Sequence, residues 1–221
     1  MTGKLVVVTG TGTEIGKTYL AEALLVGLGK AGVRAAGIKP VESGADVLTS
    51  DAERLRLASP CHVKHSSLRL PKPVSPHLAA RLAGLSISPG LLAEDARRCL
   101  SEVDVLLVEL AGGLFSPLTD EVLNADLALR LAPHVLLLVA PDRLGVLHDT
   151  VATVRAAAAM GLTVDAIALV APPCADASTG TNASELQRFV PTRVVGTAPR
   201  AALSSLAEHP VVTLTLQILL R

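Results

Sequence analysis

A glycine-rich stretch near the N-terminus carries residue types that bind phosphate groups. Residues 10–18 read GTGTEIGKT and directly follow the apolar run Lys4–Thr9. In such a loop backbone N–H groups attract anionic oxygens, Lys17 adds a mobile positive charge, and the Thr18 hydroxyl can bind Mg²⁺. The spacing departs from the usual phosphate loop, because Thr11 stands five residues before the glycine of Gly-Lys-Thr. We predict a phosphate loop of a different kind; the alternative is an ordinary glycine-rich turn.

A lysine follows the second apolar run, at the start of the sequence KPVESG (residues 39–44). If Lys39 lies beside the phosphate loop, its charge can stabilise a second anion or a phosphoryl group in transfer. Taken alone, Lys39 would be a solvated lysine at a strand end. The neighbouring phosphate loop favours the first interpretation.

Two carboxylates are placed to bind a metal ion. Glu109 ends the third apolar run and precedes the sequence LAGG, and Asp51 follows the second run. Mg²⁺ needs only one or two carboxylates besides hydroxyl, water and phosphate oxygens. Thr18 and Glu109 are therefore candidate Mg²⁺ ligands, and Asp51 is a further candidate. Asp51 could instead be the N-cap of a helix, with Ser50 as a rival cap.

The elements that must position these residues follow from the alternation of short apolar runs with longer helical patterns. Predicted strands are Lys4–Thr9, Arg34–Lys39, Asp104–Glu109, His134–Ala140, Asp165–Val170 and Thr192–Gly196. Predicted helices are Lys17–Lys30, Asp51–Ala58, Leu91–Ser101, Asp126–Leu131, Leu147–Met160 and Ser184–Phe189.

These strands are apolar nearly throughout, as expected when helices cover both faces of a sheet. The pattern predicts an α/β fold of the P-loop NTPase type, with a doubly wound, mostly parallel sheet and helices on both faces. We expect one domain over residues 1–221, with 60–89 as a surface excursion. Ligands bind beyond the carboxyl ends of such strands, so the chemistry is expected after Thr9, Lys39, Glu109 and Ala140.

Composition narrows the class of protein. Half of the 221 residues are hydrophobic, but only one Tyr and two Phe occur, so the core must be aliphatic. Twenty basic residues balance twenty acidic ones, which argues against a nucleic-acid or membrane-surface protein. Three widely spaced cysteines do not suggest a disulfide framework. We expect a cytoplasmic protein without a membrane-spanning segment.

The motifs together resemble the dethiobiotin synthetases, ATP-dependent carboxylases of biotin synthesis. Their signature loop G-T-x-T-E-x-G-K-T matches residues 10–18, and the spacing that departs from the ordinary loop is normal in this family. The resemblance continues through the whole chain in KPVESG (39–44), SDA (50–52), SPH (75–77), AGG (111–113), LG (144–145) and VVGTAP (194–199).

The resemblance implies the reaction. A 7,8-diaminononanoate amine takes up CO₂, or bicarbonate as its source, to form a carbamate, which attacks the γ-phosphate of ATP. The second amine then closes a cyclic urea and expels phosphate. Mg²⁺ and ATP, or another nucleoside triphosphate, are required. The family works as a homodimer in which each substrate site borrows residues from the neighbouring subunit.

The resemblance also assigns roles to residues. Catalytic groups would be Lys17, Lys39, Thr13 and Ser43, and the metal ligands Thr18, Asp51 and Glu109. The nucleotide would bind to Gly12, Thr13, Glu14, Ile15, Gly16, Lys17, Thr18, Tyr19 and Pro199. The diamine would bind to Thr13, Lys39, Ser43, Leu144, Gly145 and His148.

Three departures from the family pattern concern the substrate and base ends of the site. Leu110 replaces a glycine after the third strand, which predicts added bulk beside the pocket. Residues 170–174 (VAPPC) lack the asparagine that reads the base, so base discrimination would be loose or made by backbone near Pro199. His148 replaces an asparagine that meets the substrate carboxylate from the neighbouring subunit.

Other interpretations remain open at this point. A partitioning-type regulatory ATPase has a related fold, but carries a second lysine early in the loop, where this chain has Gly12 or Thr13. A divergent paralogue could bind nucleotide without turnover. The cluster CHVKH (61–65) contains metal-binding residue types, but its spacing matches no standard zinc pattern.

Overall fold

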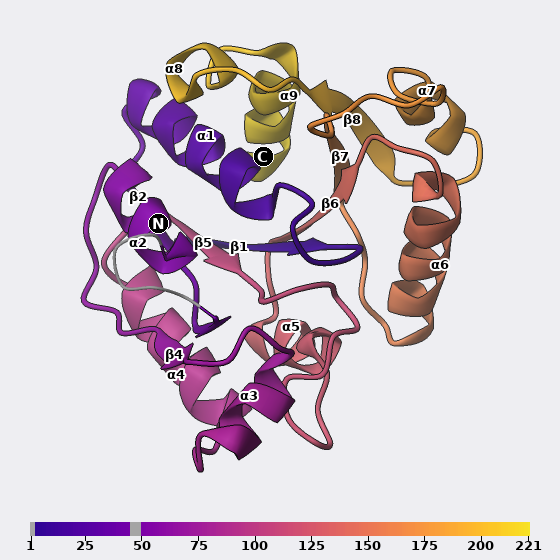
Figure 1. Ribbon diagram of the computed structural model, residues 1–221. Coiled ribbons are helices and arrows are strands. Elements are labelled where there is room, and N and C mark those ends of the chain that lie inside the picture. Colours follow the sequence, from indigo (N-terminus) through magenta and orange to yellow (C-terminus); the bar gives the residue numbers. More distant parts are fainter. Residues whose placement is uncertain (1–2, 45–49) are drawn as a thin grey trace.

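The computed structural model describes residues 3–44 and 50–221, and its centre is a sheet of six parallel strands (Figure 1). The strand order is β2-β5-β1-β6-β7-β8. The bounds are β1 Lys4–Gly10, β2 Ala35–Ile38, β5 Val105–Glu109, β6 Val135–Pro141, β7 Ala166–Val170 and β8 Arg193–Ala198. This confirms the predicted parallel α/β fold.

Helices cover both faces of the sheet. One face packs against α1 (Lys17–Lys30), α2 (Asp51–Ala58), α8 (Leu203–Leu206) and α9 (Pro210–Leu219). The other packs against α3 (Pro76–Leu82), α4 (Pro89–Leu100), α5 (Asn124–Leu131), α6 (Val146–Ala159) and α7 (Asn182–Leu186). The two faces bury two aliphatic clusters on opposite sides of the sheet.

Strand β1 illustrates how an apolar run serves both clusters. Successive side chains of a strand point to opposite faces. Leu5 and Val7 join the cluster under α4 and α5, and Val6 and Val8 join the cluster under α1. All four side chains are buried, which explains why the run shows no polar alternation.

The predicted surface excursion, residues 60–89, is more ordered than expected. It contains β4 (Leu68–Leu70), which pairs in parallel with β3 (Val41–Ser43) in a second, two-stranded sheet, and it contains α3. Leu70 and Ala79 from this segment are buried in the main cluster. The prediction of a surface excursion is therefore wrong. The elements β4 and α3 are too short for their sequences to show a clear periodicity.

The topology places the candidate residues at one edge of the sheet. Strand order reverses at β1, where β5 lies on one side and β6 on the other. The loops after β1, β2 and β5 therefore meet beyond the carboxyl ends of their strands.

Of the helices in the described ranges, each is too short or too polar to cross a membrane.

Candidate active site

The loop between β1 and α1 is shaped as a phosphate-binding cradle. Gly16 precedes α1 with a φ of 96°, and a Cβ there would lie 2.7 Å from Cγ1 of Val170. Only glycine fits both the positive φ and the close approach. Glu14 also has a positive φ of 56°. The Lys17 ammonium reaches back and donates to the Gly12 carbonyl at 2.8 Å, so the loop curls around its own lysine.

The loop after β5 packs directly on this cradle. A Cβ on Gly113 would lie 3.1 Å from the Gly10 carbonyl oxygen and 3.2 Å from the Gly12 nitrogen. The Leu114 N–H donates to the Gly10 carbonyl at 2.9 Å. The glycine pair after β5 therefore lets two loops touch backbone to backbone.

Glu109 stands at the centre of the site. It is buried, with 1 % of its surface exposed, and its Oε1 accepts from the Thr18 hydroxyl at 2.9 Å and from the Lys39 ammonium at 2.8 Å. Its other oxygen, Oε2, is buried and has no hydrogen-bond partner within residues 3–44 and 50–221. A buried carboxylate oxygen without a partner is costly, and a bound cation would satisfy it.

Asp51 completes the set from the start of α2. The helix is capped by Ser50, whose hydroxyl accepts from the Glu53 N–H at 3.1 Å. Asp51 is therefore not the N-cap, and its carboxylate instead lies 2.5 Å from the Lys39 ammonium. Glu42 fixes this end of the helix by accepting from the Asp51 N–H at 2.6 Å.

Burial and neighbouring charges set the protonation of these groups. Burial alone would lower the pKa of Lys39, but the adjacent Glu109 and Asp51 carboxylates raise it above its ordinary value. Burial alone would raise the pKa of Asp51, and the Lys39 ammonium holds it below its ordinary value. Burial lowers the pKa of Lys17 to about 8. Lys39 is therefore a permanent cation between two carboxylates.

These residues line a cleft of about 650 Å³. Of the predicted site residues, it is lined by Thr13, Glu14, Ile15, Gly16, Lys17, Thr18, Tyr19, Lys39, Ser43, Asp51 and Glu109. Two more contact lining residues: the Gly12 carbonyl binds Lys17, and the Pro199 carbonyl accepts from the Tyr19 hydroxyl at 2.9 Å.

Three predicted substrate residues lie elsewhere. Leu144 is 81 % exposed, and Gly145 and His148 are also exposed, at the start of α6. They do not line the cleft of their own chain. The fourth expected loop, after β6, therefore does not join the other three.

Comparisons with known proteins agree with this geometry. A family model described as an AAA domain matches residues 4–207. The ATP-dependent dethiobiotin synthetase of Ralstonia nicotianae is 37 % identical over 201 residues, which cover 87 % of each chain. That of Anaeromyxobacter sp. strain K is 39 % identical over 197 residues, which cover 87 % of this chain and 88 % of its own. The chain belongs to the dethiobiotin synthetase family.

Solved structures with a similar fold are more distant. The septum site-determining protein MinD of Pyrococcus horikoshii has a TM-score of 0.60 at 15 % identity, and covers 99 % of this chain and 95 % of its own. A ParA family ATPase of Chlorobium tepidum has a TM-score of 0.56 at 11 % identity, with coverages of 97 % and 91 %. At this identity the likeness extends to the fold alone.

Leu110 departs from the dethiobiotin synthetase pattern without crowding the cleft. Its side chain is 2 % exposed and belongs to the core cluster, while Ala111 and Gly112 line the cleft. Its φ is not positive. The predicted added bulk beside the pocket is therefore wrong, because the backbone turns the side chain away from the site at this position.

Three charged residues of the site were not predicted. Glu42 holds the start of α2, Arg54 lines the cleft and lies 2.5 Å from Glu22, and Arg200 lines it at the opposite end. Glu42 belongs to the motif KPVESG and Arg54 lies one helical turn after Asp51, so both had a sequence signal. Arg200 had only its position after Pro199.

Among the described residues, His65 is the only member of the cluster 61–65 that lies in a group of three metal-binding side chains. His65 Nδ1 lies 2.5 Å from Asp95, and Cys99 is close to both. The other oxygen of Asp95, however, binds the Arg98 guanidinium at 2.5 Å. A cation beside this carboxylate would be repelled by the guanidinium, so the group is better described as a hydrogen-bonded ion-pair network.

Proposed function

We propose that this protein closes 7,8-diaminononanoate with CO₂ to dethiobiotin at the expense of ATP. Family membership supports the reaction, and one observation carries the assignment of the site. Two buried cations, Lys17 and Lys39, and the Glu109 oxygen that has no partner among residues 3–44 and 50–221 converge on one cleft at the end of the sheet. Such a cleft suits a polyphosphate with its metal and a second anion beside it.

The donor set fits Mg²⁺. The Thr18 hydroxyl, the Asp51 carboxylate and Glu109 offer only oxygen atoms, which this hard cation prefers. Mg²⁺ bound there would neutralise charge on the β- and γ-phosphates. The Asp51 and Glu109 carboxylates also bind the Lys39 ammonium, so the ammonium and a bound Mg²⁺ would share these two ligands.

The chain's own residues then perform three tasks. The loop amides and Lys17 hold the triphosphate. Lys39, kept charged by Glu109 and Asp51, faces the carbamate oxygens and the phosphoryl group in transfer. Thr13 and Ser43 line the cleft near these groups and orient the carbamate or the amines. Attack of the second amine on the carbonyl forms the ring and releases phosphate.

The decisive test is product formation. Purified protein with Mg-ATP, 7,8-diaminononanoate and bicarbonate should form dethiobiotin, detected by mass, together with phosphate. Omission of any component should abolish both. Phosphate release that ignores the diamine would instead support a regulatory ATPase, and tight nucleotide binding without product would support a non-catalytic paralogue.

We propose further that the chain is a single domain that acts as a homodimer in the cytoplasm. The exposure of Leu144, Gly145 and His148 outside the cleft supports a role in the site of a second subunit. A two-fold axis would make both sites equivalent. The absence of a cysteine pair among the described residues, all three being free thiols, is compatible with a reducing compartment.

Subunit complementation tests the shared site. His148→Glu places a negative charge where the substrate carboxylate is expected and should inactivate, as should Lys39→Ala. Mixed dimers of the two variants contain one site with neither substitution, so an equal mixture should recover about one quarter of the wild-type activity. Dimers of either variant alone are the controls. Native mass spectrometry verifies that the subunits have exchanged. A mixture no more active than the dimers of either variant alone would then argue against a shared site.

Arg200 is proposed to replace the missing base-reading asparagine. Its guanidinium lies 5.4 Å from the ring centre of Tyr19, and its Nε donates to the Ala171 carbonyl at 2.9 Å, directly after β7. Arg200→Ala should raise the KM for ATP by about two- to thirtyfold with little change in kcat. The substitution removes the cation–π contact with Tyr19 at the end of the cleft that we propose for the nucleotide base. Steady-state kinetics with ATP, CTP and GTP measures this. An unchanged KM for all three would remove Arg200 from base binding.

A further inference from the structure

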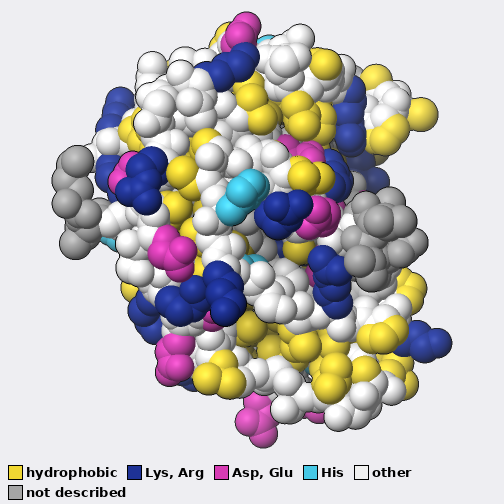
Figure 2. Space-filling model, turned by 90° about the vertical axis from the view of Figure 1, so that its left-hand side faces the viewer, with side chains coloured by type: hydrophobic (Ala, Val, Ile, Leu, Met, Phe, Trp, Pro, Cys, Tyr) yellow, Lys and Arg dark blue, Asp and Glu magenta, His cyan; other side chains and the backbone are white. Residues whose placement is uncertain are grey.

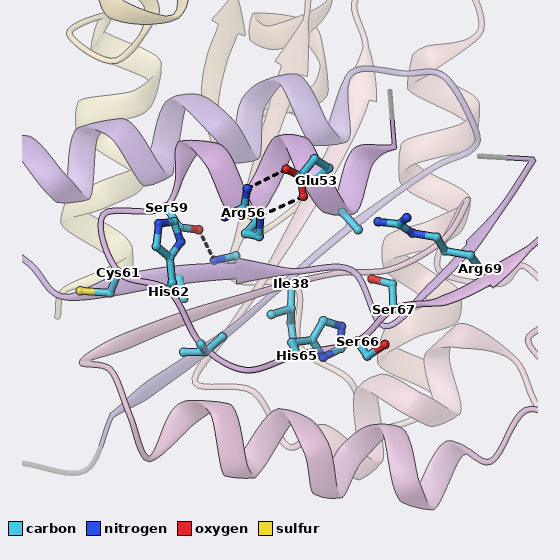
Figure 3. Close-up of a pocket in the computed structure, with 14 residues that line it drawn as sticks. Ile38, Glu53, Arg56, Ser59, Cys61, His62, His65, Ser66, Ser67 and Arg69 are labelled. Atoms are coloured by element: carbon cyan, nitrogen blue, oxygen red, sulfur yellow. Dashed lines mark hydrogen bonds and ion pairs between the residues drawn. The ribbon is translucent and has the colours of Figure 1, made fainter. Parts of the chain in front are cut away.

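A second cavity, of about 350 Å³, lies against β2 and α2, the two elements next to Lys39 and Asp51 (Figure 3). One wall is α2, the other is the segment 59–69, and the edge strand β2 runs between them. The volume is within the range of small-molecule sites. Nothing in the proposed reaction uses this cavity.

Its lining is rich in cationic and hydrogen-bond-donating side chains. Arg56, Arg69, His62, His65 and Ser66 line it, against one carboxylate, Glu53. Figure 2 views the side of the molecule that carries α2 and β2, and shows Lys and Arg side chains, with Asp and Glu side chains among them, on either side of a histidine near the middle of this face. A surface with this balance of charges attracts anions.

Glu53 does not cancel the positive charge of the cavity. It pairs with Arg56, whose Nε and Nη2 lie 2.8 and 2.7 Å from its oxygens. Arg69 has no carboxylate within ion-pair distance among residues 3–44 and 50–221, and its guanidinium makes only a 3.3 Å contact with the Ser50 hydroxyl. Among residues 3–44 and 50–221, therefore, the Arg56 guanidinium is matched by a carboxylate and the Arg69 guanidinium is not.

The cavity has fixed walls rather than a loose surface. The Ser59 hydroxyl accepts from the Gly37 N–H at 2.9 Å, and the Cys61 N–H donates to the Ala35 carbonyl at 3.0 Å. Farther along, the Ser67 hydroxyl donates to the Lys39 carbonyl. The segment 59–69 is thereby held along the edge of β2, with His65 anchored through its ion pair to Asp95.

We infer that this cavity is a binding site for a compact anion that carries a phosphate or carboxylate group. Arg69 is its principal charge and lies at one end of the cavity with Ser66, while the remaining Nη1 of Arg56 and His62 are donors toward the other end (Figure 3). The occupant contacts α2, whose first residue is Asp51, and β2, which Lys39 directly follows. A ligand in this cavity therefore rests on the same two elements that hold the carboxylate–lysine pair of the active site.

Nuclear magnetic resonance of the histidine imidazoles tests the site directly. The full chain is first saturated with Mg²⁺ and a non-hydrolysable ATP analogue, so that the phosphate loop is occupied. Inorganic phosphate is titrated in one arm and succinate in the other, at constant ionic strength set with chloride. His62→Gln and His65→Gln identify the two resonances.

We expect saturable shifts of the His62 and His65 resonances, with a dissociation constant in the millimolar range or below. Arg69→Met should weaken binding about tenfold or more, because it removes charge-assisted hydrogen bonds. Arg81→Met is the matched control. Arg81 is an exposed arginine of α3 that pairs with Asp120, and its substitution should leave the anion-induced shifts unchanged. Saturation by phosphate alone assigns a phosphate ligand, and saturation by succinate alone a carboxylate ligand. Shifts that never saturate in either arm, or that respond equally to Arg69→Met and Arg81→Met, would overturn the proposal.

Discussion

Lys39→Ala lowers the rate of dethiobiotin formation by about a thousandfold or more, because it removes a preorganised charge facing the phosphoryl group in transfer. Nucleotide affinity changes little, since Lys17 and the loop amides hold the phosphates. Mg²⁺ should bind more tightly, because Asp51 and Glu109 lose the cation with which the metal competes. Single-turnover kinetics and calorimetric titration of nucleotide and Mg²⁺ measure the three effects.

The loss of a cation beside a buried carboxylate also affects folding, so controls are needed. Removing one partner of a buried ion pair costs about 3–5 kcal/mol, which could unfold Lys39→Ala without Mg²⁺. Lys39→Gln keeps a hydrogen-bond donor for Glu109 without the charge and should be equally inactive. Lys30→Ala removes an exposed lysine paired with Glu208 and should be fully active. Substantial turnover by a folded Lys39→Gln protein would refute the electrostatic role.

Leu110→Gly destabilises the protein strongly and does not improve diamine binding. The leucine is buried in the core cluster, so its removal leaves a cavity that costs about 3–5 kcal/mol, and glycine adds roughly 1 kcal/mol of backbone entropy. Urea unfolding followed by circular dichroism should show a lower midpoint. A glycine found at this place in relatives therefore does not mean that Leu110 obstructs the cleft here.

Leu85→Gly is the matched substitution at a loop leucine that is 47 % exposed, and it should cost less than about 1 kcal/mol. The diamine KM of Leu110→Gly should remain that of the wild type. A stability loss no greater than that of Leu85→Gly, or a clearly lower KM for the diamine, would place the Leu110 side chain beside the substrate after all.

The strands that position the site could be predicted because they are continuous apolar runs. The predicted helices at Lys17–Lys30 and Asp51–Ala58 have the observed bounds, each starting at a polar residue that follows a turn. Most other bounds agree or differ by one or two residues, as helix and strand ends commonly do, and the end of α7 differs by three, at Leu186 instead of Phe189. The convergence of Lys17, Lys39 and Glu109 follows from the parallel topology, since the strands before them end at one edge of the sheet, whereas the position of Asp51 depends on where α2 begins.

What could not be predicted depends on tertiary packing. No element is predicted for residues 197–221, yet α9 forms there from a sequence rich in Val, Ile and Thr that locally favours a strand. Its buried residues, Val211, Val212, Thr215 and Leu219, recur at helical spacing and pack against α1 and the sheet. The direction of the Leu110 side chain likewise depends on where the backbone turns after β5, which residue types do not specify.

The aliphatic core leaves the protein with a built-in optical reporter. The chain has no tryptophan, and its one tyrosine, Tyr19, lines the nucleotide cleft beside Arg200. All tyrosine emission therefore arises from a single position at the base end of the site. Nucleotide binding can be followed by intrinsic fluorescence on unlabelled protein, with nucleotide absorbance held low by exciting at the red edge of the tyrosine band, and no background comes from the rest of the fold.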